Sequence, residues 1–169
     1  MPRLVAVVVA LLLAASCSGS STRAGVAELS GHAPAVRGAL IAGGTFGPGD
    51  YRGKILAVNF FNPFCGPCRK EQPELEAAAR RLEPEGVVVV GVHYVGGDWP
   101  PSASAAQRYL REMHVTYPVL EDPSSGLARG FGIPGIPSTV VVDRRGRMRF
   151  RVLGGLKERE LDDLVRELR

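Results

Sequence analysis

This sequence of 169 residues lacks the features of fibrous, repeat, nucleic-acid-binding and membrane-spanning proteins. No G-X-Y period or internal repeat accompanies its 21 Gly and 13 Pro, which excludes collagen and solenoid folds. No basic run interrupts the mixture of 21 Lys and Arg with 17 Asp and Glu, so the net charge of +4 predicts no nucleic-acid partner. No apolar run reaches the ~20 residues of a transmembrane helix. The 45% hydrophobic and 22% charged residues favour one compact domain.

The longest apolar run lies at the N-terminus, from Leu4 to Ala15, and follows the single charge of Arg3. A short charged region followed by a short apolar one is typical of a secretory signal. The small residues directly before Cys17 resemble the bacterial lipoprotein signal, in which that cysteine is diacylated and becomes the new N-terminus. We therefore predict a signal peptide over residues 1–16 and a lipid anchor at Cys17, with ordinary signal cleavage nearby as the alternative.

Residues 17–34 follow as a segment rich in Ser, Gly and Ala without sustained periodicity. This composition predicts a lipidated N-terminus with a flexible tether. The folded domain is then expected to cover residues 35–169.

Short apolar runs and helical periodicities alternate along this domain. The runs predict buried strands over 55–61, 87–92 and 139–143, the last of which continues through a turn into a hairpin partner over 148–153. Amphipathic spacing predicts helices over 69–82, 102–113, 124–131 and 161–168. This order favours an α/β fold with a mixed central β-sheet flanked by helices.

The chemistry centres on the sequence Cys65-Gly-Pro-Cys68, between a predicted strand and a predicted helix. Unpaired N–H groups and the positive dipole end of a helix N-terminus stabilise a thiolate. We expect Cys65 to be the exposed attacking thiol and Cys68 the shielded resolving thiol. The alternatives are a static disulfide and half of a zinc site. A zinc site needs about four ligands and the three histidines are scattered, so no metal and no cofactor beyond the redox-active disulfide is expected.

These cysteines stand among further motifs: Gly53-Lys54, Val58-Asn59-Phe60, Arg69-Lys70-Glu71, Pro73, Gly135-Ile136-Pro137-Ser138-Thr139 and Val141-Val142-Asp143. Together they resemble the TlpA/ResA-like group of thioredoxin-fold thiol-disulfide oxidoreductases, over nearly the whole domain. The resemblance implies a thioredoxin fold with an extra helix, near residues 102–113, inserted between the CxxC helix and the cis-proline strand.

The resemblance also assigns roles to single residues. It implies that Pro137 is the cis-proline beside the active cysteines, and cis bonds are nearly confined to proline. It makes Glu71 the acidic residue that relays a proton from Cys68, although a carboxylate that only favours the helix dipole is the alternative. Phe64 replaces the usual tryptophan, and Asn59 replaces the buried aspartate of ordinary thioredoxins.

The substrate surface is expected to consist of Phe64, Gly66, Pro67 and Ile136. The implied activity is reduction of disulfides in secreted or periplasmic client proteins, from an extracytoplasmic position anchored to the bacterial cell membrane through Cys17. Clients such as apocytochrome c, and a membrane protein that donates electrons through thiols, are the implied partners. The alternatives are a disulfide-forming oxidase of the same fold, a copper-handling protein and a thiol peroxidase.

Overall fold

The computed structural model describes residues 25–157 and 159–169. The predicted signal peptide and the predicted lipidation site at Cys17 lie outside these residues. Among the residues that the structure describes, no helix combines the length and the apolar character needed to cross a bilayer.

Six strands form the main sheet, in the order β1-β8-β7-β4-β5-β6, and two more form a small hairpin, β2-β3. The strands are β1 (Val26–Glu28), β2 (Gly38–Ala39), β3 (Thr45–Phe46), β4 (Ile55–Phe61), β5 (Val87–Tyr94), β6 (Val119–Asp122), β7 (Ser138–Val142) and β8 (Met148–Leu153). The helices are α1 (Pro48–Tyr51), α2 (Gly66–Leu82), α3 (Ala103–Glu112), α4 (Gly126–Gly130) and α5 (Glu160–Arg166), with a 3₁₀ turn at Glu83–Glu85.

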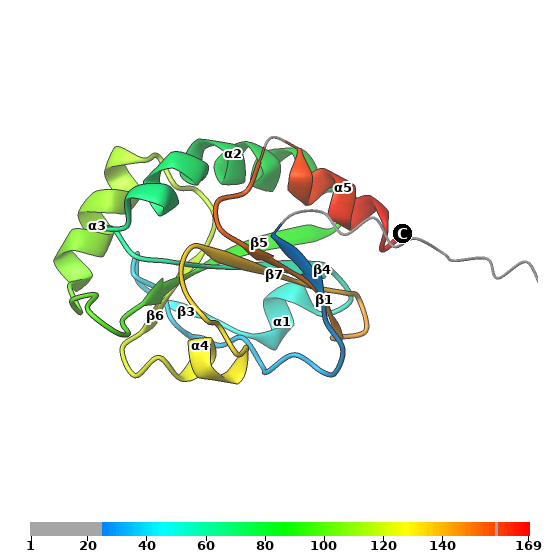
Figure 1. The fold of residues 1–169 in the computed structure, drawn as a ribbon, viewed down its shortest axis with the longest axis horizontal. Helices are drawn as coiled ribbons and strands as arrows, with labels where there is room; N and C mark the ends of the chain where they lie inside the picture. The colour runs from blue at the N-terminus through cyan, green and yellow to red at the C-terminus, as the bar shows by residue number, and fades with distance from the viewer. Residues whose placement is uncertain (1–24, 158) are drawn as a thin grey trace, which may run out of the picture.

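The sheet separates two layers of helices (Figure 1). Helices α2, α3 and α5 lie on one side of it, and the short helices α1 and α4 lie on the other. Strands β4, β5 and β6 are parallel, whereas β7 is antiparallel to β4 and β8 is antiparallel to β7. The sheet is therefore mixed, as the sequence predicted.

Strand β4 lies at the centre of the sheet and is buried along its whole length. Because side chains alternate between the two faces of a strand, Ile55 and Ala57 pack beneath α2 and α5, whereas Leu56 and Val58 pack in the opposite core. By the same alternation, Asn59 lies on the face of β4 that carries Ile55 and Ala57. The alternation therefore directs one polar amide at the underside of α2.

Helix α3 is the predicted extra helix between the CxxC helix and the cis-proline strand. Its apolar side chains Ala106 and Tyr109 are buried in one cluster with Phe61 and both cysteines of the CxxC motif. The inserted helix therefore covers the cysteines and contributes to their apolar surroundings.

The start of the domain differs from the prediction. Residues 26–28, which we assigned to the flexible tether, form β1 and pair with β8 in antiparallel register. The Leu29 amide extends this pairing by donating to the Arg149 carbonyl oxygen (2.8 Å). The predicted domain boundary at residue 35 is therefore wrong, because β1 pairs with the edge of β8. A strand of three residues is too short to be recognised within a segment rich in Ser, Gly and Ala.

Candidate active site

Cys65 and Cys68 form a disulfide at the first turn of α2, with their Cα atoms 5.2 Å apart. Cys65 is the N-cap residue of the helix, and its Sγ accepts a hydrogen bond from the Cys68 amide (3.2 Å). Pro67 fits within the first turn because a backbone N–H is not needed there. The 17-residue helix therefore directs the positive end of its dipole and its free N–H groups at the Cys65 sulfur.

The loop before the cysteines is held by Asn62, which is fully buried. Its Nδ2 donates to the carbonyl oxygen of Tyr94 at the end of β5 (2.9 Å), and its Oδ1 accepts from the amide of Phe64 (3.1 Å). Its own carbonyl oxygen accepts from the Cys65 amide (3.0 Å). The hydrogen bonds of Asn62 therefore hold the loop that connects β4 to the disulfide.

Burial of the cysteines differs from the prediction. We expected Cys65 to be exposed, but both Cys65 and Cys68 are 1% exposed in this disulfide-bonded state. The residues between and beside them, Gly66, Pro67 and Phe64, are the exposed ones. Ala106 and Tyr109 of α3 are buried in the same cluster as both cysteines, and Ile136 packs against this cluster, which accounts for the burial of the pair.

The Ile136–Pro137 peptide bond is cis, which confirms the prediction for this bond. Pro137 is buried and Ile136 is half-buried, and Ile136 packs against the cluster that contains the cysteines. The Pro137 carbonyl oxygen accepts a hydrogen bond from the amide of Gly154 (2.9 Å), which follows β8. The structure therefore brings together Ile136 and the two predicted cysteines.

Glu71 lies one helical turn after Cys68, on the buried face of α2, and is 4% exposed. Its Oε1 accepts a hydrogen bond from Asn59 Nδ2 (2.9 Å), and its Oε2 accepts from the Leu156 amide (2.8 Å). Asn59 Nδ2 also donates to Thr139 Oγ1 (3.0 Å), its neighbour on β7. Each carboxylate oxygen of Glu71 therefore has a neutral hydrogen-bond donor.

Burial raises the pKa of Glu71 from 4.5 to about 7, although the hydrogen bonds from Leu156 and Asn59 oppose the rise. Desolvation is the larger effect because water stabilises a carboxylate more than two neutral donors do. Glu71 is therefore able to gain and lose a proton near neutral pH, as a proton acceptor next to a thiol requires.

Sequence reasoning missed a buried group of hydrogen bonds around Gln72 on α2. The Gln72 carbonyl accepts hydrogen bonds from the hydroxyls of Tyr109 (3.2 Å) and Tyr117 (2.8 Å). Burial raises the pKa of both tyrosines, so they remain neutral donors. His93 is 3% exposed, and burial lowers its pKa. Within the described ranges, no three side chains of His, Cys, Asp or Glu gather as a metal site would require.

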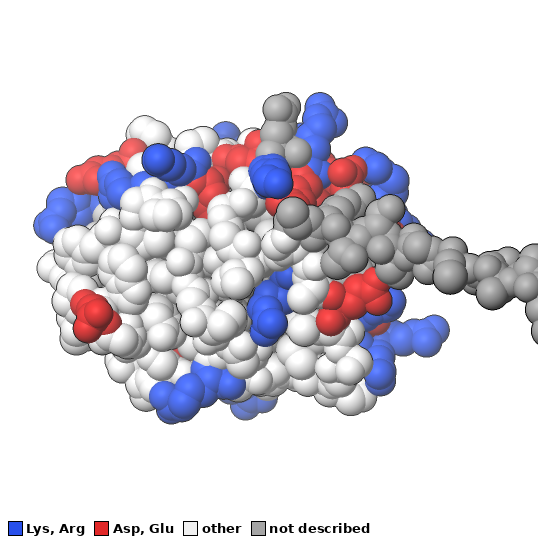
Figure 2. All heavy atoms as spheres, in the orientation of Figure 1, with Lys and Arg blue, Asp and Glu red and all other residues white. Residues whose placement is uncertain are grey.

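Two large apolar side chains next to the active-site motifs are exposed. Phe64 precedes Cys65 and is 53% exposed, and Leu153, the register partner of Ser138 next to Pro137, is 50% exposed. On the face shown in Figure 2, charged side chains gather along the edges over α2 and α5 and near α4, whereas the surface between them is largely uncharged. Exposed apolar side chains such as Phe64 and Leu153 suit contact with another polypeptide.

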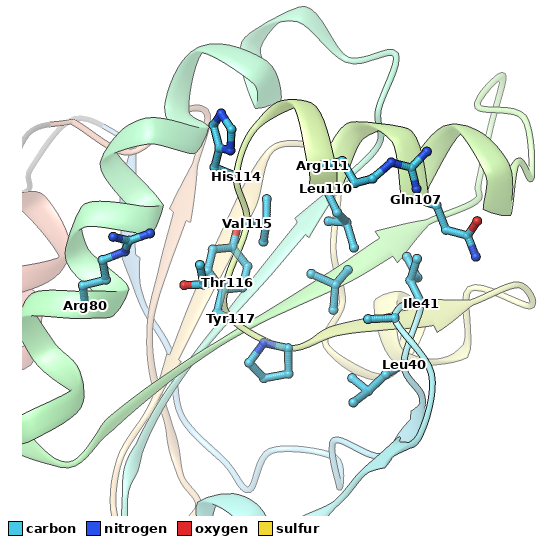
Figure 3. A pocket seen from close by; sticks show the side chains of 13 residues that line it. Leu40, Ile41, Arg80, Gln107, Leu110, Arg111, His114, Val115, Thr116 and Tyr117 are labelled. Atoms are coloured by element: carbon cyan, nitrogen blue, oxygen red, sulfur yellow. The ribbon is translucent and has the colours of Figure 1, made fainter.

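A separate groove of about 1040 Å³ lies between α3 and the β2–β3 hairpin (Figure 3). Its walls carry apolar side chains such as Leu40, Ile41 and Leu110, with Arg80, Arg111 and His114 around them. None of the residues predicted for the active site lines it.

A cysteine pair that begins a helix, next to a cis-proline and above a mixed sheet of this strand order, defines a thioredoxin-fold protein. A solved structure of a DsbF homologue from Corynebacterium diphtheriae shares this fold, with a TM-score of 0.73 and 23% identity. The match covers 88% of this chain and 96% of that one.

Sequence comparison agrees with the fold. The AhpC/TSA family profile matches residues 30–151, and the chain belongs to this family. It is 39% identical over 129 residues to the thiol:disulfide interchange protein HelX of Rhodobacter capsulatus, across 75% of this chain and 68% of that protein. It is 33% identical over 106 residues to the thiol:disulfide interchange protein DsbE of Pseudomonas aeruginosa, across 62% of this chain and 54% of that protein.

These relatives, together with ResA proteins at 20–24% identity, place the chain among the TlpA/ResA-like oxidoreductases of the thioredoxin fold. The chain is a thiol-disulfide oxidoreductase. Its disulfide-bonded CxxC pair agrees with that activity.

Proposed function

We propose that the chain is a lipid-anchored, extracytoplasmic reductant of disulfides in secreted or periplasmic client proteins. The observation that carries this proposal is the Cys65–Cys68 disulfide at the N-terminus of α2, directly after the exposed Phe64 and one helical turn from the buried carboxyl group of Glu71. The extracytoplasmic position rests on the predicted signal peptide and on relatives whose names describe disulfide interchange.

In the proposed reaction, the reduced Cys65 thiolate attacks one sulfur of a client disulfide. The client S–S bond breaks, its other sulfur leaves as a thiolate and takes up a proton, and a mixed disulfide with Cys65 forms. The N-terminus of α2 stabilises the attacking thiolate through its free N–H groups and dipole.

Resolution uses the second cysteine. The Cys68 thiol gives its proton to the Glu71 carboxylate and attacks the Cys65 sulfur. The bond between Cys65 and the client breaks, the client sulfur leaves as a thiolate that takes up a proton from solvent, and the Cys65–Cys68 disulfide forms. Two electrons have then passed from the protein to the client. A membrane protein that donates electrons through thiols is proposed to reduce the pair again, since the compartment itself is oxidising.

Two features support reduction over oxidation. Gly66 and Pro67, between the cysteines, add neither a positive charge nor a side-chain donor, so the helix N-terminus is the main stabiliser of the thiolate. When Glu71 is ionised, its charge disfavours a second negative charge on the neighbouring cysteines. A less stabilised thiolate makes the dithiol a stronger reductant.

Titration of the Cys65–Cys68 pair against reduced and oxidised glutathione tests the direction. We expect a potential closer to that of thioredoxin, about −270 mV, than to that of the strong oxidant DsbA, about −120 mV. A value near the oxidant, together with a pair that is disulfide-bonded in cells, would instead identify the disulfide-forming oxidase.

A further inference from the structure

Glu71 is tied to two different parts of the fold. Asn59, on the central strand β4, donates to Oε1, and the backbone of Leu156, in the connection between β8 and α5, donates to Oε2. The two donors are buried, with Asn59 1% and Leu156 7% exposed. Each bond therefore lies in a region where an unpaired carboxylate is costly.

The connection that contains Leu156 also reaches the cis-proline. The Gly154 amide donates to the Pro137 carbonyl oxygen, and two residues later the Leu156 amide donates to Glu71. Gly155, between them, lies over Glu71: a Cβ at this position would be 3.6 Å from the Glu71 Cβ and 3.9 Å from Oε2. We call residues 154–156 the strap, because these three residues join the Pro137 loop to the carboxyl group.

We propose that Asn59 and the Leu156 amide of the strap are positioning groups that fix the buried carboxyl group of Glu71 one helical turn from Cys68 and favour its ionised form, and that Gly155 keeps a further apolar group away from Oε2. This inference rests on the proposed role of Glu71 as the proton acceptor. The inference adds the groups that position the Glu71 carboxylate, namely Asn59, the Leu156 amide and Gly155. In the proposed reaction none of these groups contacts the client or the sulfur atoms.

The direction of the effect follows from the geometry. A carboxylate is a stronger hydrogen-bond acceptor than a carboxylic acid, so each donor favours the ionised form. Removal of one donor should raise the pKa of Glu71 by about one unit. Tyr109 and Tyr117 are the titratable side chains whose pKa the Glu71 charge raises further, and because burial keeps both neutral at physiological pH, they add no charge that would act on Glu71.

The first test removes the Asn59 donor. The substitution Asn59→Leu keeps the approximate volume of the side chain and deletes the amide. In the purified full chain, the pH at which insulin-disulfide reduction reaches half of its maximum should rise by about one unit, and the rate at neutral pH should fall roughly fivefold. Tyr117→Phe is the matched control, because it deletes a buried hydrogen bond to the neighbouring Gln72 without removing a donor to Glu71; its midpoint should stay unchanged.

The second test adds a methyl group at the strap. Gly155 has no positive φ that would strain alanine, so Gly155→Ala changes mainly the space over Oε2. Because the methyl group adds an apolar contact 3.9 Å from Oε2 of a carboxyl group that is already buried, it should disfavour the ionised form further, and the midpoint should again move to higher pH. A midpoint that stays in place or falls in both Asn59→Leu and Gly155→Ala overturns the proposal.

The same substitutions in a Glu71→Gln background separate a positioning role from a structural one. Without an ionisable group at position 71, neither Asn59→Leu nor Gly155→Ala should move the midpoint. Equal shifts with and without Glu71 would refute the inference, although the oxidoreductase activity would stand. Loss of the proposed function has a different signature: the parent protein would fail to reduce insulin at any pH.

Discussion

At the scale of single residues, the carboxyl group of Glu71 has the most unusual environment next to the disulfide. Its buried position costs the folded protein free energy whenever the group is ionised, since its pKa is raised from 4.5 to about 7. Between these two values the native state holds a proton that the unfolded state has lost. Stability should therefore fall as the pH rises from 4.5 to 7, and stay level above that.

This gives a prediction for Glu71→Gln. A difference of about 2.5 pKa units corresponds to about 3 kcal/mol in the free energy of unfolding across that pH window. Glu71→Gln, which has nothing to ionise, should lose this part of the pH dependence. Urea unfolding of both proteins at pH 4.5 and pH 8 measures it, and an identical pH dependence in the two would show that Glu71 does not titrate as described.

Sequence motifs predicted several single residues of the site and missed others. The cysteine pair, Pro137 and Glu71 stand within short motifs, so the order of amino acids alone is enough to locate them. The donor from Leu156 is a backbone N–H, which every residue except proline has, and no side-chain pattern marks it. Asn59 was noticed only as a substitute for aspartate, because its orientation depends on the register of β4 with β7.

At the scale of elements, β1 is one part of the fold that the sequence did not predict, together with the β2–β3 hairpin and the short helix α1. Its three residues pair with β8, and the Leu153 amide donates to the Gly25 carbonyl oxygen beyond its end (2.8 Å). Val26 also packs against the core beneath α2 and α5. The longer strands were predictable, because continuous apolar runs or clear alternation mark them, whereas β1 depends on an edge supplied by distant residues.

Removal of β1 should therefore destabilise the domain. A chain that begins at residue 35 should unfold at lower temperature than one that begins at residue 25, because it loses the β1–β8 hydrogen bonds and the Val26 contact. The expected loss is about 2 kcal/mol or more in the free energy of unfolding. Thermal unfolding followed by circular dichroism compares the two, and equal midpoints would mean that β1 contributes nothing to stability.

At the scale of the whole molecule, the position of β1 bears on the proposed membrane anchor. Strand β1 begins at Val26, so eight residues, 18–25, lie between Cys17 and this strand, fewer than in the tether that was predicted. Fully extended, eight residues span at most about 29 Å. If Cys17 carries lipid, the domain lies close to the bilayer, within reach of a membrane-embedded electron donor.

The anchor itself is tested by Cys17→Ala in bacteria labelled with a fatty acid. The parent protein should carry the label and sediment with membranes, and Cys17→Ala should lose the label. Retention of both the label and the membrane association in Cys17→Ala would place the anchor elsewhere. Cys65→Ala serves as the control, since it removes a cysteine from the active site and leaves the predicted lipidation signal intact.

The central claim is that Cys65 attacks client disulfides and Cys68 resolves the product. Its most direct measurement is the mixed disulfide that accumulates when the resolving thiol is absent. Reduced Cys68→Ser protein should form a covalent adduct with insulin, or with clients in membranes, and mass spectrometry should locate the bond at Cys65. The reduced Cys65→Ser protein should form little or none. An adduct that forms preferentially through Cys68, or no adduct from either variant, would contradict the account.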